Sequence, residues 1–170
     1  MSLLTKIYTK LRTIFSEPTM TAAKAWQAVG GEAEHPYWLY AAPVNMLLGR
    51  DSFFLIEPAP MPTSNDERTA LMASLNQHFC GLGYYFYVVN DIWFLGLDDD
   101  PEITTTAIDT VKNKDVAAYL PQGDGALIWN KFQNEIQMLL FNHPVNASRE
   151  AQGQPVINSL WCYAVGAFEK

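Results

Sequence analysis

The chain has 170 residues, a length that predicts one domain, and 49% of them are hydrophobic while 17% are charged. This composition excludes a disordered chain, a collagen and a coiled-coil rod. Eleven basic and eighteen acidic residues give a net charge of −7. Because proteins that grip nucleic-acid phosphates rely on clustered lysine and arginine, this charge argues against nucleic acid as a partner.

The first part of the chain, residues 1–33, is expected to hold two helices. Residues 3–15 place apolar side chains at helical spacing, with basic residues between them. We interpret this segment as an amphipathic helix that packs on its own domain; the alternative is a basic-faced helix that docks on a partner or a membrane surface. Residues 21–29 predict a second helix, which Gly30 and Gly31 end.

The sequence carries the features of a cytoplasmic protein that has no membrane partner. A secretory signal needs an unbroken apolar run, and basic residues interrupt residues 1–15. The chain has no apolar run of about 20 residues, the length that crosses a bilayer. Cys80 and Cys162 are two lone thiols, which is typical of a reduced protein without a disulfide framework.

Residues 34–170 are expected to form an α+β domain. Aromatic runs predict strands at residues 37–40 and 53–56, and Ser64 begins a predicted helix that ends at Gly81. Two apolar runs that flank Asn90 and Asp91 predict a β-hairpin over residues 84–97.

The second half of the chain adds helices and a last strand. Short helices are expected at residues 106–112 and 116–120. The strongest predicted helix follows Gly125, and one apolar stripe along it contains Trp129, Phe132, Ile136, Leu139 and Leu140. Pro144 suits the first turn of a short helix, and residues 157–165 predict a buried strand in the same sheet as the hairpin. We therefore expect a single domain with a mixed or antiparallel sheet of about five strands, packed with helices.

The standard glycine-rich, nucleophile-elbow and metal-binding motifs are missing, but residues 134–161 are dense in polar groups. A helix end, a proline-started helix and a strand start bring four polar residues of this region together: His143, Asn146, Arg149 and Asn158. Free N–H groups near residues 144–146, with an arginine one turn further on, suit a carboxylate or a phosphate. These four residues are the candidate site for a small anionic metabolite.

The alternative interpretation of the same residues is structural. In that case Asn146 caps backbone groups, Arg149 pairs with Glu135 or Glu150, and His143 is a half-buried imidazole whose hydrogen bonds are satisfied.

Several motifs also carry a resemblance to a known family. They are Ala42-Pro43-Val44 with Arg50-Asp51, Leu75-Asn76-x-x-Phe79, Leu120-Pro121-Gln122-Gly123, and the run from Asn134 to Trp161. Over residues 35–163 the chain resembles the proteobacterial Rpf E-type regulatory proteins, which are related to cofactor-independent phosphoglycerate mutases. Residues 143–158 are similar to a segment of the archaeal-type mutases. The family continues W-x-W-G-x-G where this chain has Trp161-Cys162-Tyr163, and the chain resembles the front portion of the family.

The resemblance does not imply mutase activity. Such mutases hold a Ser or Thr nucleophile between two metals with several Asp and His ligands, whereas His35, His78 and His143 are scattered. We expect no catalytic residue, metal or cofactor, and a non-catalytic regulatory domain that binds a small anionic or phosphorylated metabolite. One alternative is a protein-interaction module, as a homo-oligomer or with a partner, that uses its aromatic surface. The other is a mutase-related enzyme that lacks its catalytic metal domain.

Overall fold

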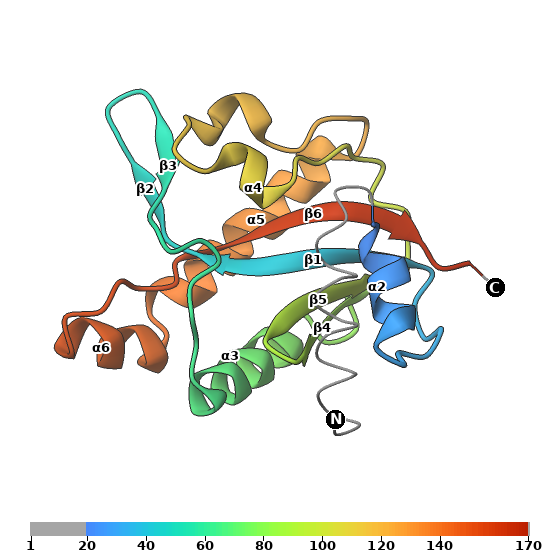
Figure 1. Ribbon diagram of the computed structural model, residues 1–170, viewed down its shortest axis with the longest axis horizontal. Coiled ribbons are helices and arrows are strands. Elements are labelled where there is room, and N and C mark those ends of the chain that lie inside the picture. Colours follow the sequence, from blue (N-terminus) through green and yellow to red (C-terminus); the bar gives the residue numbers. More distant parts are fainter. Residues whose placement is uncertain (1–19, 170) are drawn as a thin grey trace, which may run out of the picture.

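The structure, a computed structural model that describes residues 20–169, contains a four-stranded antiparallel sheet with the strand order β4-β5-β1-β6 (Figure 1). Its strands are β1 (Tyr37–Val44), β4 (Tyr84–Val89), β5 (Ile92–Leu97) and β6 (Ser159–Ala167). A separate two-stranded ribbon pairs β2 (Met46–Leu48) with β3 (Phe53–Leu55). The α+β class is confirmed. The main sheet has four strands rather than about five, because β3 pairs with β2 outside it. The helix expected at residues 3–15 lies outside the described residues.

The β4–β5 hairpin forms as the sequence predicts. Asn90 and Asp91 have φ angles of 49° and 66°, the left-handed conformation that a two-residue hairpin turn of type I′ requires at both positions. Val89 pairs with Ile92 directly beside this turn. The turn sets the register, so Phe86 and Leu95 face the same core.

One face of the sheet is covered by α3 (Asn65–His78) and α5 (Ala126–Phe141). The buried stripe of α5 consists of Trp129, Phe132, Ile136 and Leu140, and the ring of Phe132 stacks on Tyr84 with 4.1 Å between centroids. The predicted stripe is thus confirmed, with Leu139 only partly buried at its edge.

The opposite face of the sheet is covered in two places. Near one end of β1, α2 (Ala22–Ala28) packs Trp26 against Trp38, with 4.2 Å between ring centroids. Near the other end lie the ribbon, α4 (Ile108–Val111) and the 3-10 helix η1 (Val116–Tyr119), which replaces the helix expected at residues 116–120 (Figure 1). Because both faces of β1 are covered, residues 38–44 are all buried and the strand is a continuous apolar run.

The C-terminal region positions the candidate residues. His143 caps α6 (Pro144–Ala151), and Pro144 occupies its first turn as predicted. The chain then enters β6, which is an edge strand of the sheet. Helix α5 flanks β6 on one face, and residues 104–121 flank it on the other (Figure 1). Within residues 20–169, no helix combines the length and apolarity needed to cross a membrane.

Candidate functional site

The side chain of Asn146 is buried and fully hydrogen-bonded within the chain. Its Nδ2 donates to the carbonyl oxygens of Leu140 and Ile157, at 2.8 and 2.7 Å. Its Oδ1 accepts from the backbone N–H of Ile157 at 2.8 Å. One carboxamide thus ties the end of α5 to the segment that leads into β6, and both of its N–H donors are used within the chain.

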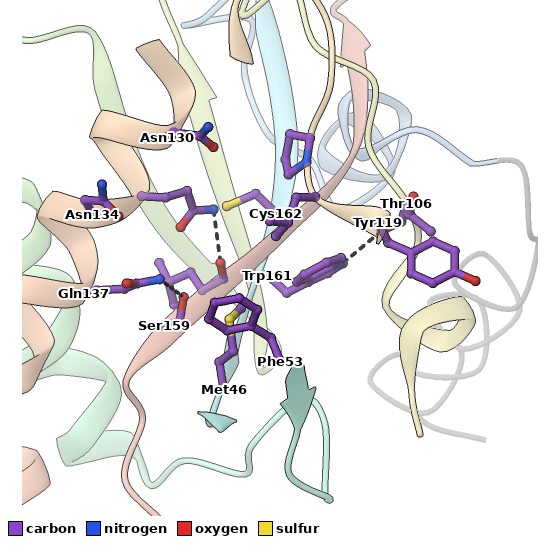
Figure 2. Close-up of a pocket in the computed structure, with 14 residues that line it drawn as sticks. Met46, Phe53, Thr106, Tyr119, Asn130, Asn134, Gln137, Ser159, Trp161 and Cys162 are labelled. Carbon is purple, nitrogen blue, oxygen red and sulfur yellow. Dashed lines mark hydrogen bonds between the residues drawn. The ribbon is translucent and has the colours of Figure 1, made fainter. Parts of the chain in front are cut away.

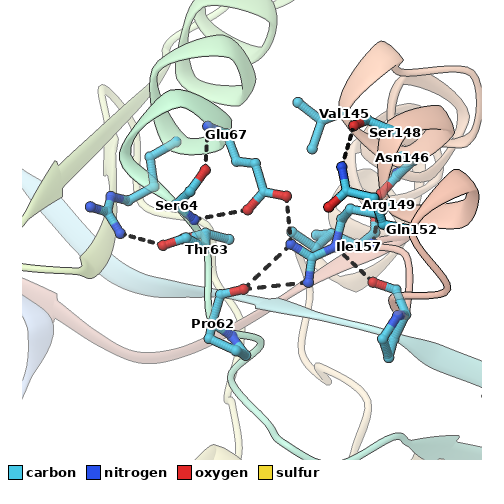
Figure 3. Close-up of polar contacts among 12 residues, drawn as sticks. Pro62, Thr63, Ser64, Glu67, Val145, Asn146, Ser148, Arg149, Gln152 and Ile157 are labelled. Atoms are coloured by element: carbon cyan, nitrogen blue, oxygen red, sulfur yellow. Dashed lines mark hydrogen bonds and ion pairs between the residues drawn. The ribbon is translucent and has the colours of Figure 1, made fainter.

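Arg149 is also buried, and its guanidinium is shared among groups of this chain (Figure 3). Its Nε donates to the carbonyl of Pro155 at 2.7 Å, and Nη1 donates to Oε1 of Glu67 at 2.8 Å. The other carboxylate oxygen of Glu67 accepts from the N–H of Ser64, which completes a capping box at the start of α3. The charge of Arg149 is therefore balanced by an acid 82 residues away, and not by Glu135 or Glu150.

His143 acts as the N-terminal cap of α6. Its Nδ1 accepts from the N–H of Val145 at 3.1 Å, and its Nε2 lies 2.8 Å from Oγ of Ser74. Burial lowers the pKa of His143, so the imidazole is neutral at neutral pH.

The expectation of free N–H groups at the start of α6 is wrong. Proline has no N–H, the N–H of Val145 is bound to the cap, and the N–H groups of Asn146 and Ala147 donate to the carbonyl of His143. The capping histidine and the tight first turn use the donors that an anion would need.

The side chain of Asn158 makes its hydrogen bonds with β2 and not with the other three residues. Its Oδ1 accepts from the N–H of Met46 at 2.7 Å, and its Nδ2 donates to the carbonyl of the same residue at 3.0 Å. A groove of about 730 Å³ beside Arg149 also has Asp66 and Glu67 in its wall, and these acids would repel an anion. An anion site at these four residues stays a prediction. The contacts of Asn146 and His143 match the structural alternative, whereas Arg149 pairs with Glu67 and not with the acids that this alternative named.

A second candidate site lies along the outer edge of β6. Here a pocket of about 350 Å³ is bounded by α5 on one side and by residues 106–121 and the β2–β3 ribbon on the other (Figure 2). Pockets of this size accept small molecules. The pocket exists because β6 pairs with β1 on one side and has no strand among residues 20–169 on the other, so the elements that cover the two faces of the sheet extend past this edge.

The α5 side of the pocket presents four carboxamides, at spacings of three and four residues that place them side by side on the helix. They are Asn130, Gln133, Asn134 and Gln137. Gln133 donates to the carbonyl of Leu160 at 3.2 Å, and its Oε1 has no partner among residues 20–169. Within the same range, no hydrogen bond fixes the side chains of Asn130 and Asn134, which are exposed at the mouth.

The opposite wall is aromatic and apolar. Phe53, Tyr119 and Trp161 come from three separate elements and contribute rings to it. The indole N–H of Trp161 donates to the carbonyl of Thr106 at 2.8 Å, which fixes the ring. At the floor, burial raises the pKa of the Cys162 thiol to about 12, so this sulfur stays protonated and is a poor nucleophile.

The charge of this pocket sets it apart from other cavities of the protein. Among the described residues, none that lines it is charged. In contrast, Asp99, Asp100 and Glu102 line a cavity beside Trp129. Across residues 20–169, no cluster of three His, Cys, Asp or Glu side chains is placed to hold a metal ion.

Sequence reasoning found part of this site but interpreted it differently. Asn134 and Gln137 lie in the segment that is dense in polar groups, whereas Asn130 and Gln133 precede it. The signal was the spacing of the four amides along a single stripe next to the apolar stripe of α5. These amides line a pocket only because β6 is an edge strand, and the order of strands cannot be read from the sequence.

Comparisons with known proteins identify the fold. Neither models of protein families nor the curated proteins give a match to this sequence. Among solved structures, the chain is similar to the cofactor-independent phosphoglycerate mutase from Thermoplasma acidophilum DSM 1728, with a TM-score of 0.61 and 17% sequence identity. The similarity covers 97% of this chain and 47% of that one, so this chain spans about half the length of the mutase. At this level of identity the similarity shows a shared fold.

Proposed function

We propose that this chain is a non-catalytic regulatory domain that binds a small molecule in the pocket along β6. The observation that carries the proposal is the row of carboxamides facing an aromatic wall across a cavity of about 350 Å³. Two of these amides, on Asn130 and Asn134, have no hydrogen-bond partner within residues 20–169 and are available to a ligand. The resemblance to Rpf E-type regulatory proteins supports a regulatory role, and the two free thiols suit a protein of the cytoplasm.

The chemistry of the lining supports binding rather than catalysis. Among the described residues it contains no acid, histidine or lysine that would transfer protons, and the thiol of Cys162 is protonated. We accordingly expect no phosphatase or phosphoglycerate mutase activity from this chain. Turnover of 3-phosphoglycerate that persists through repurification and is lost with Arg149→Ala would contradict that expectation.

Protein-detected NMR tests the binding site directly. A library of small neutral and anionic molecules, 3-phosphoglycerate among them, is titrated into the labelled chain. We expect hits to shift the indole N–H signal of Trp161 and the side-chain amide signals of Asn130 and Asn134. A Trp161→Phe variant assigns the indole signal.

Two matched variants locate the binding. Asn134→Trp places a large ring at the pocket mouth, and Met138→Trp places the same ring one turn further on, outside the lining. Binding should be lost in the first and kept in the second. Hits that bind both variants equally would overturn the proposal, and shifts centred on Arg149 and His143 would favour the anion site in its place.

A second function, self-association, is favoured by the outer stripe of α5. Leu127, Met138 and Phe141 recur there at helical spacing and are 70%, 73% and 79% exposed. A second copy of the chain would cover the same stripe in a two-fold contact. Sedimentation equilibrium tests this: a dimer that Phe141→Lys dissociates supports it, and a monomer at all concentrations contradicts it.

A further inference from the structure

The pocket along β6 also indicates which class of molecule it takes, an inference that rests on the binding function proposed above. We infer that its ligand is an uncharged nucleobase or nucleoside, whose flat ring lies against the aromatic wall while its edge pairs with the carboxamides of α5. The inference depends on the charge, the donor and acceptor pattern, and the shape of the lining.

The absence of positive charge among the described lining residues disfavours phosphorylated nucleosides as ligands. No described lining residue is a cation that would pair with a phosphate. Charges of both signs lie near the rim: the carboxylate of Asp115 accepts from the N–H of Phe53 at 3.0 Å, and the ammonium of Lys114 lies 5.7 Å from the ring centre of Tyr119. The bond from Phe53 and a second one from Ala117 lower the pKa of Asp115, so this carboxylate is ionised at neutral pH. A phosphate inside the pocket would lose its water without gaining a cation from the lining.

The hydrogen-bonding pattern favours a ligand edge that carries a donor and an acceptor side by side. A carboxamide offers an N–H donor and a carbonyl acceptor, and it therefore pairs in two-bond fashion with a group of the same pattern. Nucleobase edges have this pattern, and proteins read unstacked bases through such bonds combined with stacking on aromatic rings. The amides of Asn130 and Asn134, one turn apart on the same helix, have no hydrogen-bond partner among the described residues 20–169.

The remaining lining suits a flat ring. The fixed indole of Trp161 and the ring of Phe53 lie across the pocket from α5 (Figure 2), and Tyr119 also lines it. Stacking of a base on an aromatic side chain is favourable and tolerates differences between bases. A pocket of about 350 Å³ is small, which fits a base or a nucleoside better than a dinucleotide.

Isothermal titration calorimetry with a defined panel tests the class of ligand. The panel is adenosine, inosine, uridine and cytidine, together with 3-methyluridine, inosine alkylated at its ring N–H, and the four 5′-monophosphates. We expect at least one nucleoside to bind. Methylation of its edge N–H should weaken binding about tenfold, because the partner amide is left unpaired. The 5′-phosphate should weaken it several-fold at low salt and less at high salt.

Two variants test whether the amides of Asn130 and Asn134 bind the nucleoside. Asn130→Ala and Asn134→Ala should each weaken nucleoside binding about tenfold without lowering the melting temperature. Lys131→Ala, on the same helix but outside the lining, should leave binding unchanged.

The outcomes separate this inference from the function on which it rests. The nucleobase inference is overturned if library molecules bind at Trp161 with affinities that depend only on their apolar area, and if N-methylation leaves binding unchanged or strengthens it. The binding function would still stand in that case. Monophosphates that bind as tightly as nucleosides overturn the nucleobase inference too. If no molecule of the library or the panel binds in the pocket, both fail.

Discussion

The network at α6 and the pocket along β6 use the same kinds of side chain in opposite ways. At α6, the amide of Asn146 makes three hydrogen bonds inside the protein, and the guanidinium of Arg149 reaches a carboxylate and two carbonyls. At the pocket, the amides of Asn130 and Asn134 make none with the described residues. Both regions appear in the sequence as polar residues beside apolar helices.

Comparison of the two regions shows when a polar side chain has a structural role. Buried polar groups need partners, and a chain provides these where three segments converge, as α5, α6 and the segment before β6 do around Asn146. An edge strand brings fewer segments together. Of the amides beside β6, those of Gln133 and Gln137 reach the strand, while those of Asn130 and Asn134 have no partner among residues 20–169. The two regions therefore differ in the hydrogen-bond partners of their polar side chains and not in the types of side chain.

The largest effect is expected from Asn146→Ala. This change leaves the carbonyl and the N–H of Ile157 without their partner in the interior, and each costs about 1–3 kcal/mol. It also removes one of the bonds to the carbonyl of Leu140, which still accepts from the N–H of His143. The free energy of unfolding should fall by about 3–5 kcal/mol in urea denaturation. A loss below about 1 kcal/mol would show that this amide is not structural, and would remove the contrast with the pocket.

A smaller loss, about 2–3 kcal/mol, is expected from Arg149→Met, which removes the partner of a largely buried carboxylate while keeping most of the side-chain volume. Glu67 is partly exposed and regains some water, which limits the loss. The double variant with Glu67→Gln should be more stable than the sum of the single losses predicts. Strictly additive losses would mean that the pair is not coupled.

The pH dependence of stability should reveal the cap at His143. Burial lowers the pKa of His143 in the folded state below the ordinary value of 6.5, so protons bind the unfolded chain more readily. The stabilisation that depends on a neutral His143 is therefore fully present well above pH 6.5 and declines as the pH falls below that value. His143→Asn keeps a capping side chain and should flatten this decline. His78→Asn, at an exposed histidine, should retain it; equal slopes in the two variants would be contrary to the expectation.

The sequence was sufficient for most of the fold, because its signals are local. Asn90 and Asp91 fix a hairpin, Ser64 and Glu67 cap α3, and Pro144 starts α6, each through contacts a few residues long. The site depended on contacts between distant residues. The partner of Arg149 lies 82 residues away, and the free edge of β6 follows from the order of strands in the sheet. Neither this ion pair nor the strand order produces a pattern in the local sequence.

The smallest effect is expected from the double variant Asn130→Ala and Asn134→Ala. These side chains have no hydrogen-bond partner among the described residues and are exposed on a helix, and alanine favours helix more than asparagine does. The free energy of unfolding should therefore change by less than about 0.5 kcal/mol, or rise slightly. Urea denaturation of this variant beside Asn146→Ala compares the same chemical change in the two regions. A loss above about 1 kcal/mol would place these amides in a structural network like that of α6, and they would then no longer be free to bind a ligand.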